Sequence, residues 1–206
     1  MKTKSKALLL SLCAVMLVAA SIFGTLAYLT DTDAVENTFT VGQVGITLDE
    51  ADVNPDGTYV SDENVRVHAN EYHLMPGHEY IKDPTVHVDA DSEDSWLFVQ
   101  VDNGIAAIED STNTIAAQMD ENGWTLVDDT ANVYAYKEVV QAGANVPVFN
   151  RFKISGDVEG TKPETPEDGV LYLSDYKDAV INVTAYAVQA DGFDNAAAAW
   201  EAAFGA

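Results

Sequence analysis

Oxygen-bearing side chains recur at alternate positions in the segment that runs from Asp52 to Glu63. Asp52, Asn54 and Asp56 are followed by Gly57, and Glu63 completes a match to the pattern D-x-N-x-D-G-x5-E. Ca²⁺ takes oxygen ligands at the first, third, fifth and twelfth positions of such a loop and requires a glycine at the sharp turn. The segment is therefore a candidate calcium site, and calcium is the one candidate cofactor.

The same segment also carries a strong turn signal. Pro55 and Tyr59 are unusual inside a calcium loop, and the flanking residues have the pattern of strands where a calcium loop of this type has helices. Asn-Pro-Asp-Gly is a favourable type I turn sequence between two strands. We favour a plain hairpin turn, with the calcium site as the alternative.

Four histidines lie within twenty positions: His68, His73, His78 and His87. A helical zinc peptidase needs the motif H-E-x-x-H, but the stretch 78–82 begins with His-Glu and ends in lysine. A turn at 76–77 could regroup the histidines, yet surface positions are the better interpretation. G-x-S-x-G is absent and the only cysteine is Cys13, so no nucleophile signature supports catalysis.

The charge of the chain excludes two classes of partner. Its 206 residues include 34 acidic and 10 basic side chains, a formal net charge of −24. Three of the basic residues precede residue 28, so the remainder has 34 acids and 7 bases, a net charge of −27. A field of this sign repels nucleic acid and anionic lipid surfaces. With 47% hydrophobic residues, the chain can still form one domain with a core.

The N-terminus has the three-part layout of an export signal. Lysines precede an uncharged run over residues 7–23, and small residues follow it. The pattern predicts cleavage between Ala27 and Tyr28, with an uncleaved membrane anchor as the alternative, because the 17-residue run falls just short of a full span. We therefore divide the chain into a signal peptide (1–27), an N-terminal segment (28–40) and one domain (41–206).

Short apolar segments separated by turn signals predict a series of strands. They cover residues 38–48, 59–68, 85–89, 96–101, 133–140, 146–154 and 180–189. The segment 96–101 is apolar on both faces, which is expected of a strand enclosed between layers. Residues 111–122 and 195–204 predict helices, the second with Asn195 as its N-cap. The pattern predicts an all-β fold, a jelly-roll-like β-sandwich with short helices, including a C-terminal one.

Two sequence blocks add a family resemblance. The first joins the signal to the domain, with Ser21–Asp31 running into Asn37–Leu48, and the second is the Pro-Gly block Met75–Val86. Together they resemble the TasA/camelysin family of bacterial secreted surface and biofilm-matrix proteins. The resemblance implies a jelly-roll domain, a location in the extracellular matrix or at the cell surface, and a signal cleaved by a dedicated signal peptidase of the endoplasmic-reticulum type.

In fibre-forming members of that family, cleavage frees an N-terminal segment that completes the sheet of the next subunit. The matching segment here is 28–40, and the resemblance therefore implies self-association into a homopolymer or binding to cell-surface components. Asp31, Asp33 and Glu36 are poor residues for a buried strand, so the segment folding back onto its own domain is an equal alternative.

The leading hypothesis is a secreted, acidic, structural protein that associates by β-strand addition. Two alternatives belong to other classes. One is a camelysin-like metallopeptidase, an activity that the family name carries although no zinc-peptidase motif is present. The other is a monomeric surface adhesin stabilised by calcium at Asp52, Asn54, Asp56 and Glu63.

Overall fold

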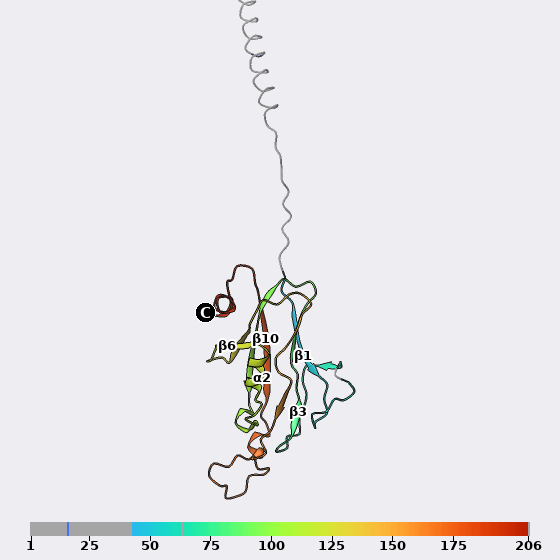
Figure 1. Cartoon of the computed structure of the whole chain (residues 1–206), viewed down its shortest axis with the longest axis vertical. Coiled ribbons are helices and arrows are strands. Elements are labelled where there is room, and N and C mark those ends of the chain that lie inside the picture. Colours follow the sequence, from blue (N-terminus) through green and yellow to red (C-terminus); the bar gives the residue numbers. More distant parts are fainter. Residues whose placement is uncertain (1–15, 17–42, 63, 206) are drawn as a thin grey trace, which may run out of the picture. The chain divides into compact units, whose positions relative to one another are not determined.

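The computed structural model describes residue 16, residues 43–62 and residues 64–205 of the chain (Figure 1). The cleavage site predicted at Ala27 and Tyr28 and the segment 28–40 lie outside the described residues. The stretch Gly42–Ala206 forms one compact unit. Among the described residues, no helix combines the length and the apolar character needed to cross a membrane.

The described residues are mostly β and include short helices, as the sequence predicts, and the strands form two four-stranded antiparallel sheets and one two-stranded pair. The first sheet has the order β2-β1-β4-β8, formed by Arg66–Val67, Ile46–Ala51, Thr85–Val88 and Asn145–Pro147. The second has the order β10-β5-β7-β6, formed by Ile181–Gln189, Ser95–Asn103, Val133–Tyr136 and Trp124–Asp128. A two-stranded pair joins β3 (Glu79–Ile81) to β9 (Arg151–Lys153). The helices are α2 (Ile115–Glu121) and α3 (Ala196–Phe204), with 3₁₀ turns at Ala106–Ile108 and Leu173–Tyr176.

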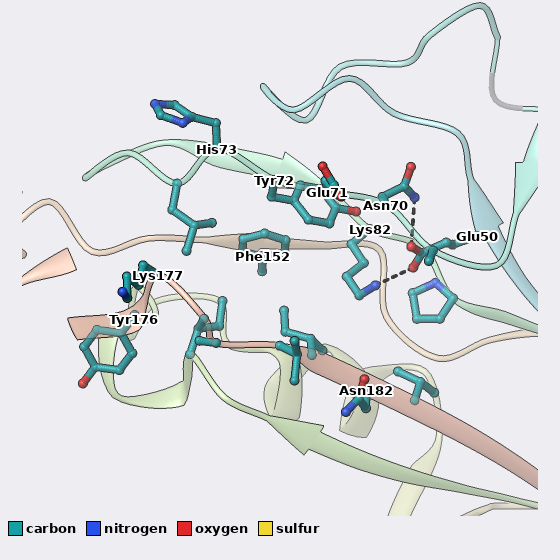
Figure 2. Close-up of a pocket in the computed structure, with 18 of the residues that line it drawn as sticks. Glu50, Asn70, Glu71, Tyr72, His73, Lys82, Phe152, Tyr176, Lys177 and Asn182 are labelled. Carbon is teal, nitrogen blue, oxygen red and sulfur yellow. Dashed lines mark hydrogen bonds and ion pairs between the residues drawn. The ribbon is translucent and has the colours of Figure 1, made fainter. Parts of the chain in front are cut away.

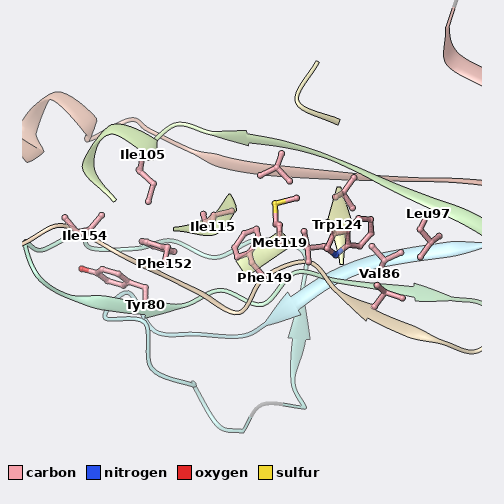
Figure 3. Packing of buried hydrophobic residues seen from close by; sticks show 14 of the residues in the cluster. Tyr80, Val86, Leu97, Ile105, Ile115, Met119, Trp124, Phe149, Phe152 and Ile154 are labelled. Atoms are coloured by element: carbon pink, nitrogen blue, oxygen red, sulfur yellow. The ribbon is translucent and has the colours of Figure 1, made fainter. Parts of the chain in front are cut away.

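Side chains from both sheets meet in one hydrophobic core (Figure 3). Val86 enters it from β4 and Leu97 from β5, and both are fully buried. Helix α2 adds Met119, and the buried Trp124 donates its indole N–H to the carbonyl of Pro147 at 2.9 Å. The alternation of apolar residues along each strand is what turns these side chains to one shared interior.

Strand β5 is buried on both faces, which confirms the interpretation of its two-sided apolar pattern. Its other face carries Phe98, which packs against Trp200 of α3 with ring centroids 5.1 Å apart. The predicted C-terminal helix is present, and the side-chain oxygen of Asn195 caps it by accepting from the amide of Ala198 at 2.9 Å. The alanine-rich helix α3 therefore covers the second face of β5, which the sequence indicated only as apolar.

The prediction of one continuous strand over 146–154 is wrong. The segment is divided between β8 and β9, which belong to different sheets. The buried side chain of Gln118 separates them, because its oxygen accepts from the amides of Asn150 and Arg151 at 3.1 and 3.2 Å. Its amide nitrogen donates to the carbonyl of Arg151 at 2.8 Å. A side chain distant in sequence thus makes the backbone hydrogen bonds that a neighbouring strand would otherwise make. No local sequence pattern indicates such a contact.

Two further differences concern short strands. The predicted strand 59–68 pairs only at Arg66–Val67, apart from an isolated bridge between Val53 and Tyr59. Strands β3 and β6 were not predicted from the sequence. Both have five residues or fewer, and such short runs give little periodicity to detect.

Candidate functional site

The two large sheets differ in how their edges are protected. Strand β2 has two residues, β8 has three and includes Pro147, and β6 has an irregular register between Leu126 and Asp128. Shortness, proline and bulges are the usual devices that stop an edge from pairing with another chain. Strand β10 has none of them: nine consecutive residues pair regularly with β5, and no described strand is hydrogen-bonded to its other side.

The hydrogen bonds that flank β10 show which of its main-chain groups face the open edge. Gly104 donates to the carbonyl of Val180 at 2.9 Å, and Ala190 donates to the carbonyl of Asp94 at 2.8 Å. In an antiparallel ladder, bonded and non-bonded pairs alternate, so even-numbered residues of β10 bond to β5. The odd-numbered residues direct N–H and C=O outward: Ile181, Val183, Ala185, Ala187 and Gln189.

The side chains beside this edge form a partly open apolar surface. Ile181, Val183, Ala185 and Ala187 pack against the shared core, and all four are only partly buried. An interior face that is incompletely covered at the edge of a sheet is suited to receive one more strand.

A cleft of about 870 Å³ lies beside the first residues of β10 (Figure 2). One wall is formed by the end of β1 and by the segment His68–Leu74, and the other by Ala179–Val183. Leu48, Tyr72 and Phe152 give much of the lining an apolar character. The volume lies within the range of pockets that hold a small molecule or a partner's side chain.

A buried ion pair lies in this cleft. The carboxylate of Glu50 is 2.5 Å from the ammonium of Lys82, and the two residues are 5% and 9% exposed. Asn70 donates to the second oxygen of Glu50 at 2.8 Å. The hydroxyl of Tyr72 donates to the carbonyl of Ile81 at 3.0 Å, and burial raises the pKa of Tyr72. The ion pair places one positive and one negative charge, with a sum of zero, in the largely apolar lining of the cleft.

Side chains from the segment that follows β2 bond to main-chain groups of β1 and of the residues after it. His68 donates from Nδ1 to the carbonyl of Leu48 at 3.0 Å, and Asn70 donates to the carbonyl of Ala51 at 2.8 Å. Asn70 also accepts from the amide of Val53 at 3.0 Å. The contact with Leu48 takes one main-chain group on the side of β1 that is not paired with β4, because even-numbered residues of β1 face that side and odd-numbered ones face β4. Of the two strands beside the cleft, β10 has the longer run of main-chain groups without a strand partner.

An ionic cluster supports the same wall. Arg66 contacts Asp49 at 2.8 Å and Asp83 at 2.6 Å, and His87 contacts Asp49 at 2.8 Å. Burial by itself would raise the pKa of Asp49, but hydrogen bonds from Arg66 and His87 outweigh it, so the pKa is lowered. The cluster keeps β1, β2 and β4 together behind the cleft.

The predicted calcium residues form a hairpin turn in the structure. Gly57 donates to the carbonyl of Asn54 at 2.8 Å, and the amide nitrogen of Asn54 donates to the hydroxyl of Thr58 at 3.2 Å. Asp56 accepts from the Thr58 amide and hydroxyl, and these bonds lower its pKa. Asp52 lies in the arm before the turn, where its carbonyl accepts from Val60, and Glu63 lies outside the described residues. Calcium binding stays a prediction.

The side chains of three of the four histidines have separate partners. His68 bonds to Leu48, His78 to the carbonyl of Asp56 at 2.8 Å, and His87 lies between Asp49 and Asn145. His73 lines the cleft. In the described part of the chain, no group of three or more metal-binding side chains is arranged to hold an ion.

Comparison of the chain with protein-family models, curated proteins and solved structures returns no match. The assignment of a function therefore depends on the geometry of the β10 edge and its cleft. Sequence reasoning identified β10 as a strand but missed its open edge and the cleft. The available signal was its alternation of apolar residues with Asn182 and Thr184, which indicates a half-exposed strand.

Proposed function

We propose that this protein is a secreted, acidic structural protein of the bacterial cell surface or extracellular matrix, of the TasA/camelysin type, which self-associates by β-strand addition. The observation that carries the proposal is the open edge of β10, with five outward-facing residues above a partly uncovered apolar surface. The incoming strand is the segment 28–40 of a second copy.

The proposal also gives a role to the N-terminal residues and to the domain. Residues 1–27 act as the export signal, and a dedicated signal peptidase cuts between Ala27 and Tyr28 to free the segment. The domain is a jelly-roll-like β-sandwich, a finer description that agrees with two antiparallel sheets sharing one core. The surface partners are further copies of the chain, or components of the cell surface.

Strand addition accounts for affinity and for register. Main-chain hydrogen bonds to the odd-numbered residues of β10 supply affinity, and alternate side chains such as Phe39 of the added strand pack on the apolar surface. A segment that leaves one copy and enters the next makes a head-to-tail contact that does not close, so it builds a filament.

The first experiment is electron microscopy with light scattering on protein beginning at Tyr28, compared with protein beginning at Val41. Filaments from the longer chain alone are the expected result. Val183→Pro in the longer chain removes an outward N–H and places a proline ring on the edge, so it should abolish filaments while the fold survives. Val183→Ala keeps the N–H and should still assemble. Monomers from the longer chain under all conditions would refute the proposal.

A further inference from the structure

Lys82 has hydrogen-bonding capacity that its surroundings do not use. An ammonium carries three N–H donors, and among the described residues the ammonium of Lys82 donates only to Glu50. Its other contact is with the ring of Tyr72, whose centroid is 5.9 Å away. The residue is 9% exposed and lines the cleft, so its remaining donors border the cleft and have no acceptor among the described residues.

The neighbours of Lys82 limit what it can bind. Glu50 holds one donor of the ammonium and is itself held by Asn70 (Figure 2). A second carboxylate at this point would lie close to Glu50 and be repelled. An uncharged acceptor meets no such repulsion, because the ion pair is neutral as a whole. The carbonyl of a peptide bond is such an acceptor.

The position of Lys82 agrees with this chemistry. The same cleft is lined by Lys82 and by Ile181 and Val183, the first two outward-facing residues of β10. A strand that pairs with these residues passes over the cleft. Half of its main-chain N–H and C=O groups bond to β10, and the other half point across the cleft, where side chains can bind them. On the wall opposite β10, the Leu48 carbonyl is already bonded to His68, whereas Lys82 still has free donors.

We propose that Lys82 binds a main-chain carbonyl of the strand that is added to β10, and so helps to select an extended peptide with an uncharged, apolar stretch at the cleft. This inference rests on the proposed function, because the strand is supplied by a second copy of the chain. Glu50 and Asn70 act as positioning residues that keep the ammonium in place.

The test compares variants of the chain beginning at Tyr28 by the critical concentration for assembly, measured by light scattering. Glu50→Gln combined with Lys82→Met removes the donors without leaving a buried unpaired charge. Because a hydrogen bond from a charged donor is lost, the critical concentration should rise about tenfold or more. Lys177→Met is the matched control, since Lys177 also lines the cleft but its side chain is 76% exposed, and it should change the value less than twofold.

The outcomes separate the two proposals. A double variant that assembles like the wild type, while Val183→Pro does not assemble, overturns the role of Lys82 and leaves strand addition standing. A wild-type chain that never assembles overturns both. Thermal melting of the monomeric double variant must stay within a few degrees of the wild type; a large fall, with assembly restored on cooling, assigns the pair a structural role and also overturns the inference.

Discussion

At the scale of single residues, most of the few cations in this chain have an acidic partner. Arg66, Lys82, Arg151, Lys153, Lys162 and Lys177 each lie within 4.0 Å of a carboxylate. In a chain with 34 acids, each such contact relieves repulsion locally, although exposed pairs contribute little to stability. The pairs therefore matter most where the carboxylate has further hydrogen bonds.

Asp110 is such a case and predicts acid sensitivity. The hydrogen bond from Lys153 at 2.7 Å, together with Thr112, holds the pKa of Asp110 well below its usual 3.8. A lowered pKa in the folded state contributes stability above pH 4, and this stability is lost as the pH falls through the folded-state pKa. Asp110→Asn should therefore lower the melting temperature at pH 7. It should also reduce the difference between the melting temperatures at pH 7 and pH 3.

The matched control is Asp129→Asn, which removes one exposed acid without those contacts. Melting curves followed by circular dichroism at both pH values provide the measurement. If Asp110→Asn and Asp129→Asn show the same pH dependence as the wild type, the Lys153 contact has no part in acid stability.

Calcium gives a second prediction at this scale. Asn54 and Asp56 already use side-chain atoms to hold the turn with Thr58, so we expect millimolar CaCl2 to change the melting temperature no more than MgCl2 does. A calcium-specific rise that disappears in Asp52→Ala combined with Glu63→Ala would instead establish the site and favour the adhesin alternative.

At the scale of elements, one side chain decides where two strands end. Gln118 of α2 makes three hydrogen bonds to the backbone of residues 150 and 151, and it is 6% exposed. It therefore connects the helix to the point where the chain crosses from the first sheet to β9.

Gln118→Ala should lower the free energy of unfolding by about 2–4 kcal/mol, because two partly buried backbone amides lose the oxygen of a buried side chain as their acceptor. Urea denaturation measures the change. Gln141→Ala, at an exposed position, is the control and should change the value by less than about 0.5 kcal/mol. An equal effect of the two substitutions would show that water replaces the Gln118 contacts.

At the scale of the whole molecule, charge opposes the proposed assembly. The chain after residue 27 has a net charge of −27, so two copies repel each other over a distance set by the salt concentration. The screening length falls from about 30 Å at 0.01 M to about 8 Å at 0.15 M ionic strength. Filaments of the chain beginning at Tyr28 should therefore form at a lower protein concentration in 0.15 M NaCl than in 0.01 M NaCl.

Light scattering across a salt series checks this expectation, with the monomer's melting temperature followed in parallel as the control. Assembly that is indifferent to salt and to divalent ions would count against an electrostatic barrier between copies.

The sequence by itself determined the local features of this protein. The apolar alternation at 96–101 and 180–189, the alanine-rich helix capped by Asn195 and the Asn-Pro-Asp-Gly turn depend on neighbours in the chain, and all appear in the structure. The mostly β class with a C-terminal helix follows from them, because strand and helix periodicity are local properties.

Only the tertiary structure decided which edges stay open and what lies beside them. The open side of β10 depends on which strands pair, and the cleft joins residues near 50, 70, 82 and 181. The division of 146–154 likewise depends on Gln118, more than thirty positions away. Such contacts form between side chains distant in sequence, so no periodicity records them. The candidate site could therefore not be found from the sequence, although β1, β9 and β10, which line it, each overlap a strand predicted from its own pattern.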